Sequence, residues 1–244
     1  MGTALVHYTA AAASDTGRKR PSNQDAAGYS IEHGIYVLCD GMGGAAAGEV
    51  ASSTAVTHIM DRLTHRDPDT PLLEAAEAAI QAANLAVFTR AAGARRLRGM
   101  GTTMVALVVD EHAAWVLNIG DSRCYLLRGR HLQQVSRDHS LVEEEVRMGR
   151  MSPAEALHSP YRNVITRALG THKLVAPDIF EVETEPGDLF LLCSDGLTRE
   201  IDDSLIEGIL RLELPLSELC DRLIDAANKA GGNDNITCLL ARAA

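Results

Sequence analysis

The chain has 244 residues, of which 23 are Lys or Arg and 33 are Asp or Glu, so its net charge is −10, and 46% of its residues are hydrophobic. This ordinary composition excludes an intrinsically disordered or collagen-like chain. The negative charge argues against binding to nucleic acids or anionic membranes, because both partners require a basic surface.

The first half of the chain predicts antiparallel strands and two long helices. Short runs rich in Val, Ile, Leu and Tyr predict strands at 4–12, 35–39, 103–109, 113–119 and 123–127. Turns at 32–34, 110–112 and 128–130 are short enough to close antiparallel hairpins. Helical spacing of apolar residues predicts helices over 48–63 and 71–92.

The second half predicts two strands, two helices and an insertion. Strands are expected at 189–193 and 236–240, one helix after an N-cap at Asp202 or Asp203, and another over 216–230. Residues 137–171 are polar, with a helix start at Ser152-Pro153-x-Glu155, and we interpret them as a small inserted flap.

Runs of strands with pairs of helices indicate an α+β fold, and the length suits one domain spanning residues 1–244. No apolar run approaches the roughly 18 residues of a membrane span, so we expect no membrane insertion.

Four aspartates, Asp40, Asp121, Asp195 and Asp234, lie at the ends of predicted strands. Taken singly, such residues are most often part of a plain turn. If the strands lie side by side, the carboxylates gather at one edge, where oxygen ligands suit a hard cation such as Mg²⁺ or Mn²⁺. The histidines and cysteines show none of the paired spacings typical of zinc sites.

A polar loop, Arg20-Pro21-Ser22-Asn23-Gln24-Asp25, follows the first predicted strand. An arginine beside a metal cluster can hold a phosphate through two parallel hydrogen bonds. A solvated loop is the simpler alternative for these residues viewed alone.

Six short motifs follow one another over residues 20–237. They are Arg20-x-x-Asn23-Gln24-Asp25, Asp40-Gly41-Met42-Gly43-Gly44, Gly101-Thr102-Thr103, Gly120-Asp121-Ser122-Arg123, Ser194-Asp195-Gly196-Leu197 and Gly232-Asn233-Asp234-Asn235-Ile236-Thr237. In this order they resemble the metal-dependent protein phosphatases of the protein phosphatase 2C type, and the full series is far more specific than any one motif. With Met42 in it, the second motif resembles that of the bacterial branch of this family.

The resemblance implies a central sandwich of two antiparallel β-sheets flanked by pairs of α-helices, with metal ions at one end. It implies a Ser/Thr protein phosphatase that uses two Mn²⁺ or Mg²⁺ ions per active site, with a third ion in bacterial-type members. A water shared between two ions would lose its proton and attack phosphorus directly, without a phosphoenzyme.

Matching positions imply a set of metal ligands. Asp40 would bridge two ions, the Gly41 carbonyl would bind one of them, and Asp195 and Asp234 would bind the other.

Three further residues complete the site implied by the resemblance. Asp25 would act in catalysis, either by binding a metal ion itself or by supporting the residues that do, Asp121 would help to hold the third ion, and Arg20 would grip the substrate phosphate.

Two residues depart from the family pattern. Many eukaryotic members of the family carry His at the position of Met42 as the proposed general acid, which a thioether cannot replace, so the proton donor is unassigned. Many relatives carry Glu at the position of Gln24, where an amide or carbonyl oxygen would have to make the contact.

Two other functions stay open. Cys193 and Arg199 have the Cys-x5-Arg spacing of cysteine-dependent phosphatases, but Cys193 ends an apolar run and Asp195 opposes thiolate formation. A phosphoprotein-binding module without activity is disfavoured because Asp40, Asp195 and Asp234 are all present.

The remaining expectations concern single residues, partners and location. His139 is expected to be an exposed flap residue and Trp115 a core residue. The five cysteines indicate buried, reduced thiols of a cytoplasmic protein. Expected partners are phosphorylated proteins and a cognate Ser/Thr protein kinase, with no nucleic acid, and nothing demands more than a monomer.

Overall fold

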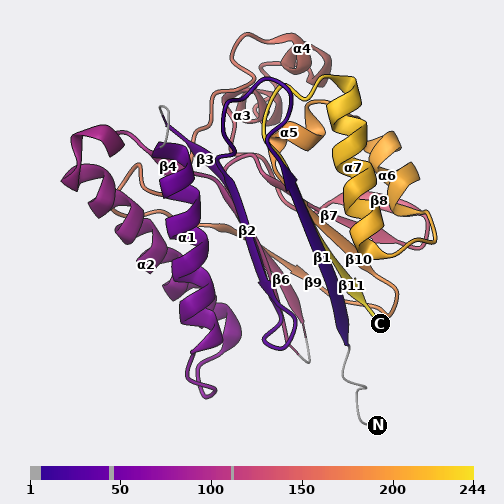
Figure 1. Cartoon of the computed structure of the whole chain (residues 1–244), viewed down its shortest axis with the longest axis horizontal. Helices are drawn as coiled ribbons and strands as arrows, with labels where there is room; N and C mark the ends of the chain where they lie inside the picture. Colours follow the sequence, from indigo (N-terminus) through magenta and orange to yellow (C-terminus); the bar gives the residue numbers. More distant parts are fainter. Residues whose placement is uncertain (1–6, 44–46, 111–112) are drawn as a thin grey trace.

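The computed structural model describes residues 7–43, 47–110 and 113–244. They form two antiparallel β-sheets packed face to face, and helices cover the outer face of each sheet (Figure 1). The predicted α+β sandwich is therefore confirmed. In the described residues, no helix has the length and apolar character needed to cross a membrane.

The first sheet has the strand order β2-β3-β5-β6-β9, and the short β4 pairs with β3. Its strands are β2 (Asp25–Ser30), β3 (Ile35–Met42), β4 (Gly101–Thr102), β5 (Met104–Val109), β6 (Ala114–Ile119) and β9 (Asp178–Val182).

The second sheet has the strand order β1-β11-β10-β7-β8. Its strands are β1 (Tyr8–Asp15), β7 (Arg123–Arg128), β8 (His131–Gln134), β10 (Leu189–Cys193) and β11 (Ile236–Ala243). The first and last strands of the chain, β1 and β11, pair along the whole length of both.

The helices form two outer layers and a small group at one end of the sandwich (Figure 1). They are α1 (Ala47–Thr64), α2 (Leu72–Gly93), the 3-10 turn η1 (Arg95–Leu97), α3 (Leu141–Arg147), α4 (Pro153–His158), α5 (Asp195–Thr198), α6 (Asp203–Leu210) and α7 (Leu216–Ala230). Two predicted helix starts are confirmed: Asp202 caps α6, and Ser152 with Glu155 forms a capping box on α4.

The apolar core has three layers. Tyr36, Leu107 and Phe190 belong to the layer between the two sheets. A second layer lies between the first sheet and helices α1 and α2, and a third between the second sheet and helices α6 and α7. Because the central strands are buried on both faces, they hold their ends rigidly, and these ends carry the predicted aspartates.

The hairpin turns predicted at 32–34 and 128–130 imply strands before the first turn and after the second, and β2 and β8 occupy these places, but the sequence patterns mark no residue range for β2, β8 or β9. All three are sheet edges, and their residues alternate between exposed and partly covered. The predicted strand at 4–12 begins at Tyr8 in the structure, and positions 4–6 lie outside the described residues. Positions 111–112 of the predicted turn at 110–112 also lie outside them.

The flap residues, 137–171, connect β8 to β9 and contain α3 and α4. Their two ends are tied to the sandwich. The bridge between Thr102 and Leu169 attaches one end to β4, and the bridge between Ser140 and Ile165 closes the base of the flap.

Candidate metal centre

Strands β2 and β3 bring two carboxylates face to face. Asp25, the first residue of β2, is the register partner of Asp40 on β3, and the two carboxyls lie within hydrogen-bonding reach. Asp25 also accepts hydrogen bonds from the hydroxyls of Ser194 (2.8 Å), which directly follows β10 of the second sheet, and Thr237 (2.7 Å) on β11. This residue therefore joins the two sheets at the edge where the predicted motifs meet.

Three more carboxylates arrive at this edge from separate elements. Asp195 follows β10 and begins α5, Asp234 precedes β11, and Asp121 lies between β6 and β7. The negative charges of all three act on Asp40. The structure thus gathers the five aspartates that the sequence singled out.

Burial and mutual repulsion raise the pKa of these carboxyls. The pKa of Asp40 lies well above its ordinary value, first because the group is buried and then because the other carboxylates repel its charge. Burial likewise raises the pKa of Asp25 and of Asp195 to about 6, and that of Asp121 to about 7. Such a concentration of buried negative charge is costly unless cations compensate it.

Unpartnered oxygen atoms provide a test of whether the site suits a metal ion. One buried carboxylate oxygen, Oδ1, of each of Asp25, Asp121 and Asp195 has no hydrogen-bond partner. Buried polar atoms rarely lack partners, and hard divalent cations take carboxylate ligands. The donors therefore fit Mn²⁺ or Mg²⁺, although no three metal-binding side chains among the described residues are preassembled as a closed site.

Two arginines lie against these carboxylates. Arg20 Nη2 is 2.6 Å from Asp234 Oδ2, and half of the Arg20 side chain (52%) is exposed. Arg199 Nη2 lies 2.6 Å from Asp195 Oδ2 and 3.1 Å from Asp121 Oδ2. Arg20 is thus at the side of the cluster that is open to solvent.

The Gly101-Thr102-Thr103 motif fixes the backbone at Asp40. The Thr102 hydroxyl donates to the Asp40 carbonyl (2.8 Å), and the Asp40 amide donates to the Thr103 hydroxyl (3.0 Å). Next in the chain, Gly41 has no room for a side chain, since a Cβ atom would collide with the Gly48 carbonyl oxygen. These contacts hold the predicted ligands Asp40 and Gly41 in place.

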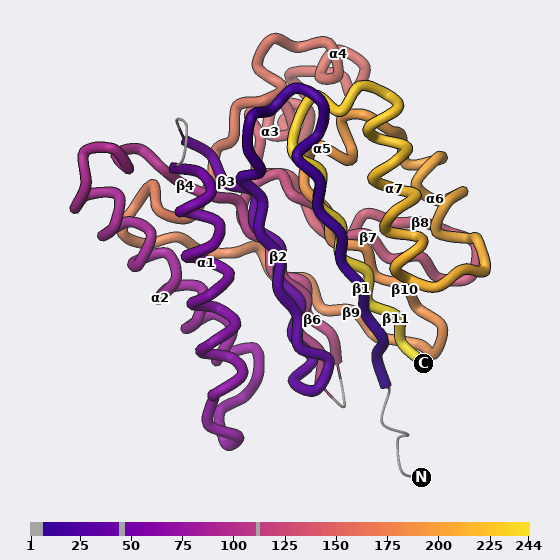
Figure 2. The backbone as a smooth tube through the Cα atoms, viewed as in Figure 1, coloured from indigo at the N-terminus to yellow at the C-terminus, as the bar shows by residue number. Residues whose placement is uncertain are grey.

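Asn235 anchors the loop that carries Arg20. Its side-chain oxygen accepts from the Gln24 amide (2.8 Å), and its side-chain nitrogen donates to the carbonyls of Thr16 and Ser22 (2.9 Å each). Figure 2 shows this β1–β2 loop at the same end of the molecule as α3, α4 and α5.

Comparison with known proteins decides the family. The family model described as protein phosphatase 2C matches residues 16–241. This chain belongs to the protein phosphatase 2C family. The serine/threonine phosphatase stp of Listeria monocytogenes is 40% identical over 93% of this chain and 92% of its own. The serine/threonine protein phosphatase PstP of Mycobacterium tuberculosis is 40% identical over 98% of this chain and 45% of its own.

Solved structures agree with this assignment to the protein phosphatase 2C family. The crystal structure of Mycobacterium tuberculosis PstP has a TM-score of 0.90 and 38% identity, covering 98% of this chain and 99% of that one. The PstP catalytic domain with two manganese ions has a TM-score of 0.89 and 36% identity, with the same coverage. The predicted family and its enzyme class, a metal-dependent Ser/Thr protein phosphatase, are confirmed.

In this protein phosphatase 2C chain, the prediction of an exposed His139 is wrong. Its exposed fraction is 5%. Its Nδ1 accepts from the Gly120 amide (3.1 Å), and its Nε2 lies 3.3 Å from Asp178 Oδ2. Burial lowers the pKa of His139, so the neutral ring holds the backbone beside Asp121. Trp115 is partly buried and packs against the core layer under α1 and α2.

The cysteines support metal-dependent chemistry over a cysteine nucleophile. All five are free and buried. Burial raises the pKa of Cys193 to about 12, so its thiol stays protonated near neutral pH. Cys193 is therefore unsuited to the nucleophilic role that the Cys-x5-Arg spacing suggests.

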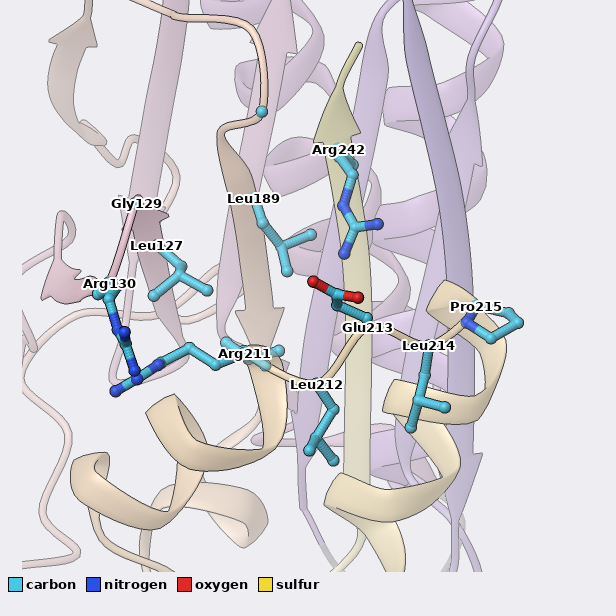
Figure 3. A pocket seen from close by; sticks show the side chains of 12 residues that line it. Leu127, Gly129, Arg130, Leu189, Arg211, Leu212, Glu213, Leu214, Pro215 and Arg242 are labelled. Atoms are coloured by element: carbon cyan, nitrogen blue, oxygen red, sulfur yellow. The ribbon is translucent and has the colours of Figure 1, made fainter.

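A separate pocket of about 770 Å³ lies at the other end of the second sheet, near the end of β7 and the start of β10 (Figure 3). In it, Arg130 and Arg211 extend toward one another, and Glu213 and Arg242 lie nearby. No predicted site residue lines it.

Proposed function

We propose that this chain hydrolyses phosphoserine and phosphothreonine on proteins at a centre of two divalent cations, and so opposes a Ser/Thr protein kinase. The observation that carries the proposal is the meeting of five carboxylates and an exposed arginine at one edge of the sandwich. In this proposal residues 1–244 act as one catalytic domain, with residues 137–171 as its flap.

The side chains suggest a division of roles. Asp40, with carboxylates on several sides, is suited to bridge two ions. We assign the Gly41 carbonyl to one ion, Asp195 and Asp234 to the other, and Asp25 to the support of this ligand set. When bound, such ions activate a water molecule and offset the charge of the phosphoryl group.

Arg20 is the proposed phosphate-binding residue. A guanidinium group has five N–H donors in a planar fork, so Arg20 can keep its contact with Asp234 and still donate to a phosphate. By contacting Asp234 and the phosphate at the same time, Arg20 would hold the phosphate beside the metal ligands.

The proton donor for the leaving oxygen is neither Met42 nor His139. The thioether of Met42 carries no proton, and His139 is buried against Gly120. We therefore propose that a water molecule protonates the leaving serine or threonine oxygen.

The proposal also covers the identity of the metal, the partners and the location of the protein. Oxygen donors accept both Mn²⁺ and Mg²⁺, so we propose that either ion supports activity. A third ion in this centre would need Asp121 and Asp195 as ligands. A monomer in the cytoplasm, acting on phosphorylated proteins and not on nucleic acid, fits the free cysteines and the charge of −10.

The test is hydrolysis of an aryl phosphate and a phosphothreonine peptide by the purified protein with Mn²⁺, with EDTA and after thiol alkylation. We expect activity that requires the metal, survives alkylation and persists in Cys193→Ser. Activity that survives EDTA but is lost on alkylation would overturn the mechanism. No activity in any condition would favour a phosphoprotein-binding module.

A further inference from the structure

Arg199 lies between two carboxylates of the metal centre. It directly follows α5 and turns back along it, with its amide donating to the Asp195 carbonyl (2.9 Å). The same side-chain nitrogen, Nη2, lies 2.6 Å from Asp195 Oδ2 and 3.1 Å from Asp121 Oδ2. One positively charged group therefore contacts both carboxylates, as a bridging metal ion would.

This arrangement is not a surface ion pair. The exposed fractions are 31% for the Arg199 side chain, 6% for Asp121 and 12% for Asp195. The two carboxylates repel one another, and Arg199 attracts both. Removal of the guanidinium would leave two buried carboxylates without a compensating charge, which is strongly unfavourable.

A third metal ion would need these same two carboxylates. Hard divalent cations bind carboxylate oxygens at roughly 2.0–2.6 Å, and a guanidinium nitrogen already lies against those oxygens. Arginine keeps its proton at any ordinary pH, so it cannot become neutral to make way for a cation. A competing ion would have to displace the whole side chain.

We propose that Arg199 is a built-in cation that takes the place of a third metal ion between Asp121 and Asp195, so that this centre holds two ions. The inference rests on the two-ion centre of the proposed function. It assigns Asp121 to orienting Arg199 and not to binding a metal.

The experiment counts bound Mn²⁺ per chain by equilibrium dialysis and elemental analysis, which needs no turnover. Arg199→Leu should bind one more ion than the wild-type protein. Adding Asp121→Asn should abolish this gain, because the new site loses one carboxylate. Arg199→Lys keeps the positive charge and should bind the same number as the wild type.

Arg211→Leu is the matched control. Arg211 also directly follows a helix, α6, and pairs with a carboxylate four residues earlier, Glu207, at 3.3 Å. It lines the distant pocket of Figure 3, so its removal should leave the count unchanged. If Arg199→Leu does not fold, Arg199→Gln makes the same test.

Two outcomes would overturn the role of Arg199: an unchanged count in the folded variant, or a wild-type count of three that Asp121→Asn reduces. A wild-type count below two, with one ion gained in Arg199→Leu, would instead contradict the two-ion centre while supporting Arg199 as the stand-in.

Discussion

Asp25 and Asp40 form an unfavourable cross-strand pair. They are register partners on adjacent strands, and like charges directly opposite one another destabilise a sheet. Hydroxyl groups stabilise both residues. Ser194 and Thr237 donate to the Asp25 carboxylate, and the Thr103 hydroxyl accepts from the Asp40 amide. A local conflict of this kind is expected where the completed site includes positive ions.

Removal of one ligand charge should slow turnover strongly. We expect Asp40→Asn or Asp195→Asn to lower kcat by on the order of 100- to 1,000-fold, because transition-state charge is no longer balanced. The measurement is aryl phosphate hydrolysis at saturating Mn²⁺. Asp202→Asn is the control, since asparagine caps a helix as well as aspartate does, and its kcat should change less than about twofold. Full activity in Asp40→Asn would remove this residue from the centre.

His139→Ala should lower the free energy of unfolding by about 1–3 kcal/mol, because it leaves the Gly120 amide without its partner in a buried place. Urea denaturation measures the change. His131→Ala, on an exposed position of β8, should stay within about 0.5 kcal/mol of the wild type. Equal effects of the two changes would show that His139 does not support the turn.

At the level of elements, burial decides which strands can be predicted. β10 reads as five consecutive apolar residues because both of its faces are covered, and its predicted and observed bounds agree. The edge strands β2, β8 and β9 bury only part of one face, so none of them carries a continuous apolar run that marks it as a strand.

In the candidate site, too, some residues could be predicted from the sequence and some contacts could not. Asp40, Asp121, Asp195 and Asp234 could be predicted because each follows or precedes a recognisable strand within a short motif. The contact of Arg199 with Asp121 spans 78 positions, and that of His139 with Gly120 joins the flap to the sandwich. No local pattern reports such contacts, because they depend on how the elements pack.

Exchange of the flap should change substrate choice without changing the chemistry. The ends of the flap are tied to the sandwich through His139 and Leu169, so the exchange should be confined to residues 141–164. We expect altered activity on phosphoproteins and aryl phosphate hydrolysis within about threefold of the wild type, since surface loops beside a rigid site usually govern selection. Equal loss on both kinds of substrate would contradict this role.

For the whole molecule, the carboxylate cluster makes stability depend on pH and metal together. Burial raises the pKa of Asp25 and Asp195 to about 6 and of Asp121 to about 7, above the 3.8 of a free side chain. Between about pH 4 and 7 the folded state therefore binds protons that the unfolded chain has released, and stability falls as pH rises. The lowered pKa of buried His139 makes stability rise with pH, but this is one group, whereas several carboxyls have a raised pKa.

The melting temperature in EDTA should accordingly fall between pH 5 and pH 8, and Mn²⁺ should raise it more at pH 8 than at pH 5. Thermal unfolding with and without Mn²⁺ measures both effects. A melting temperature in EDTA that is flat or rises over this range would show that the carboxylates are not protonated in the metal-free fold.

The pairing of β1 with β11 has a consequence for the connectivity of the chain. Tyr8 is the register partner of Ala243, and the Ala244 amide donates to the His7 carbonyl (2.7 Å), at the end of the sheet away from the carboxylates. A short linker could join these positions, while the exposed turn at Gly129 could be opened to give new ends. Such a circular permutant should keep its catalytic edge intact, because neither the new junction nor the new break touches it.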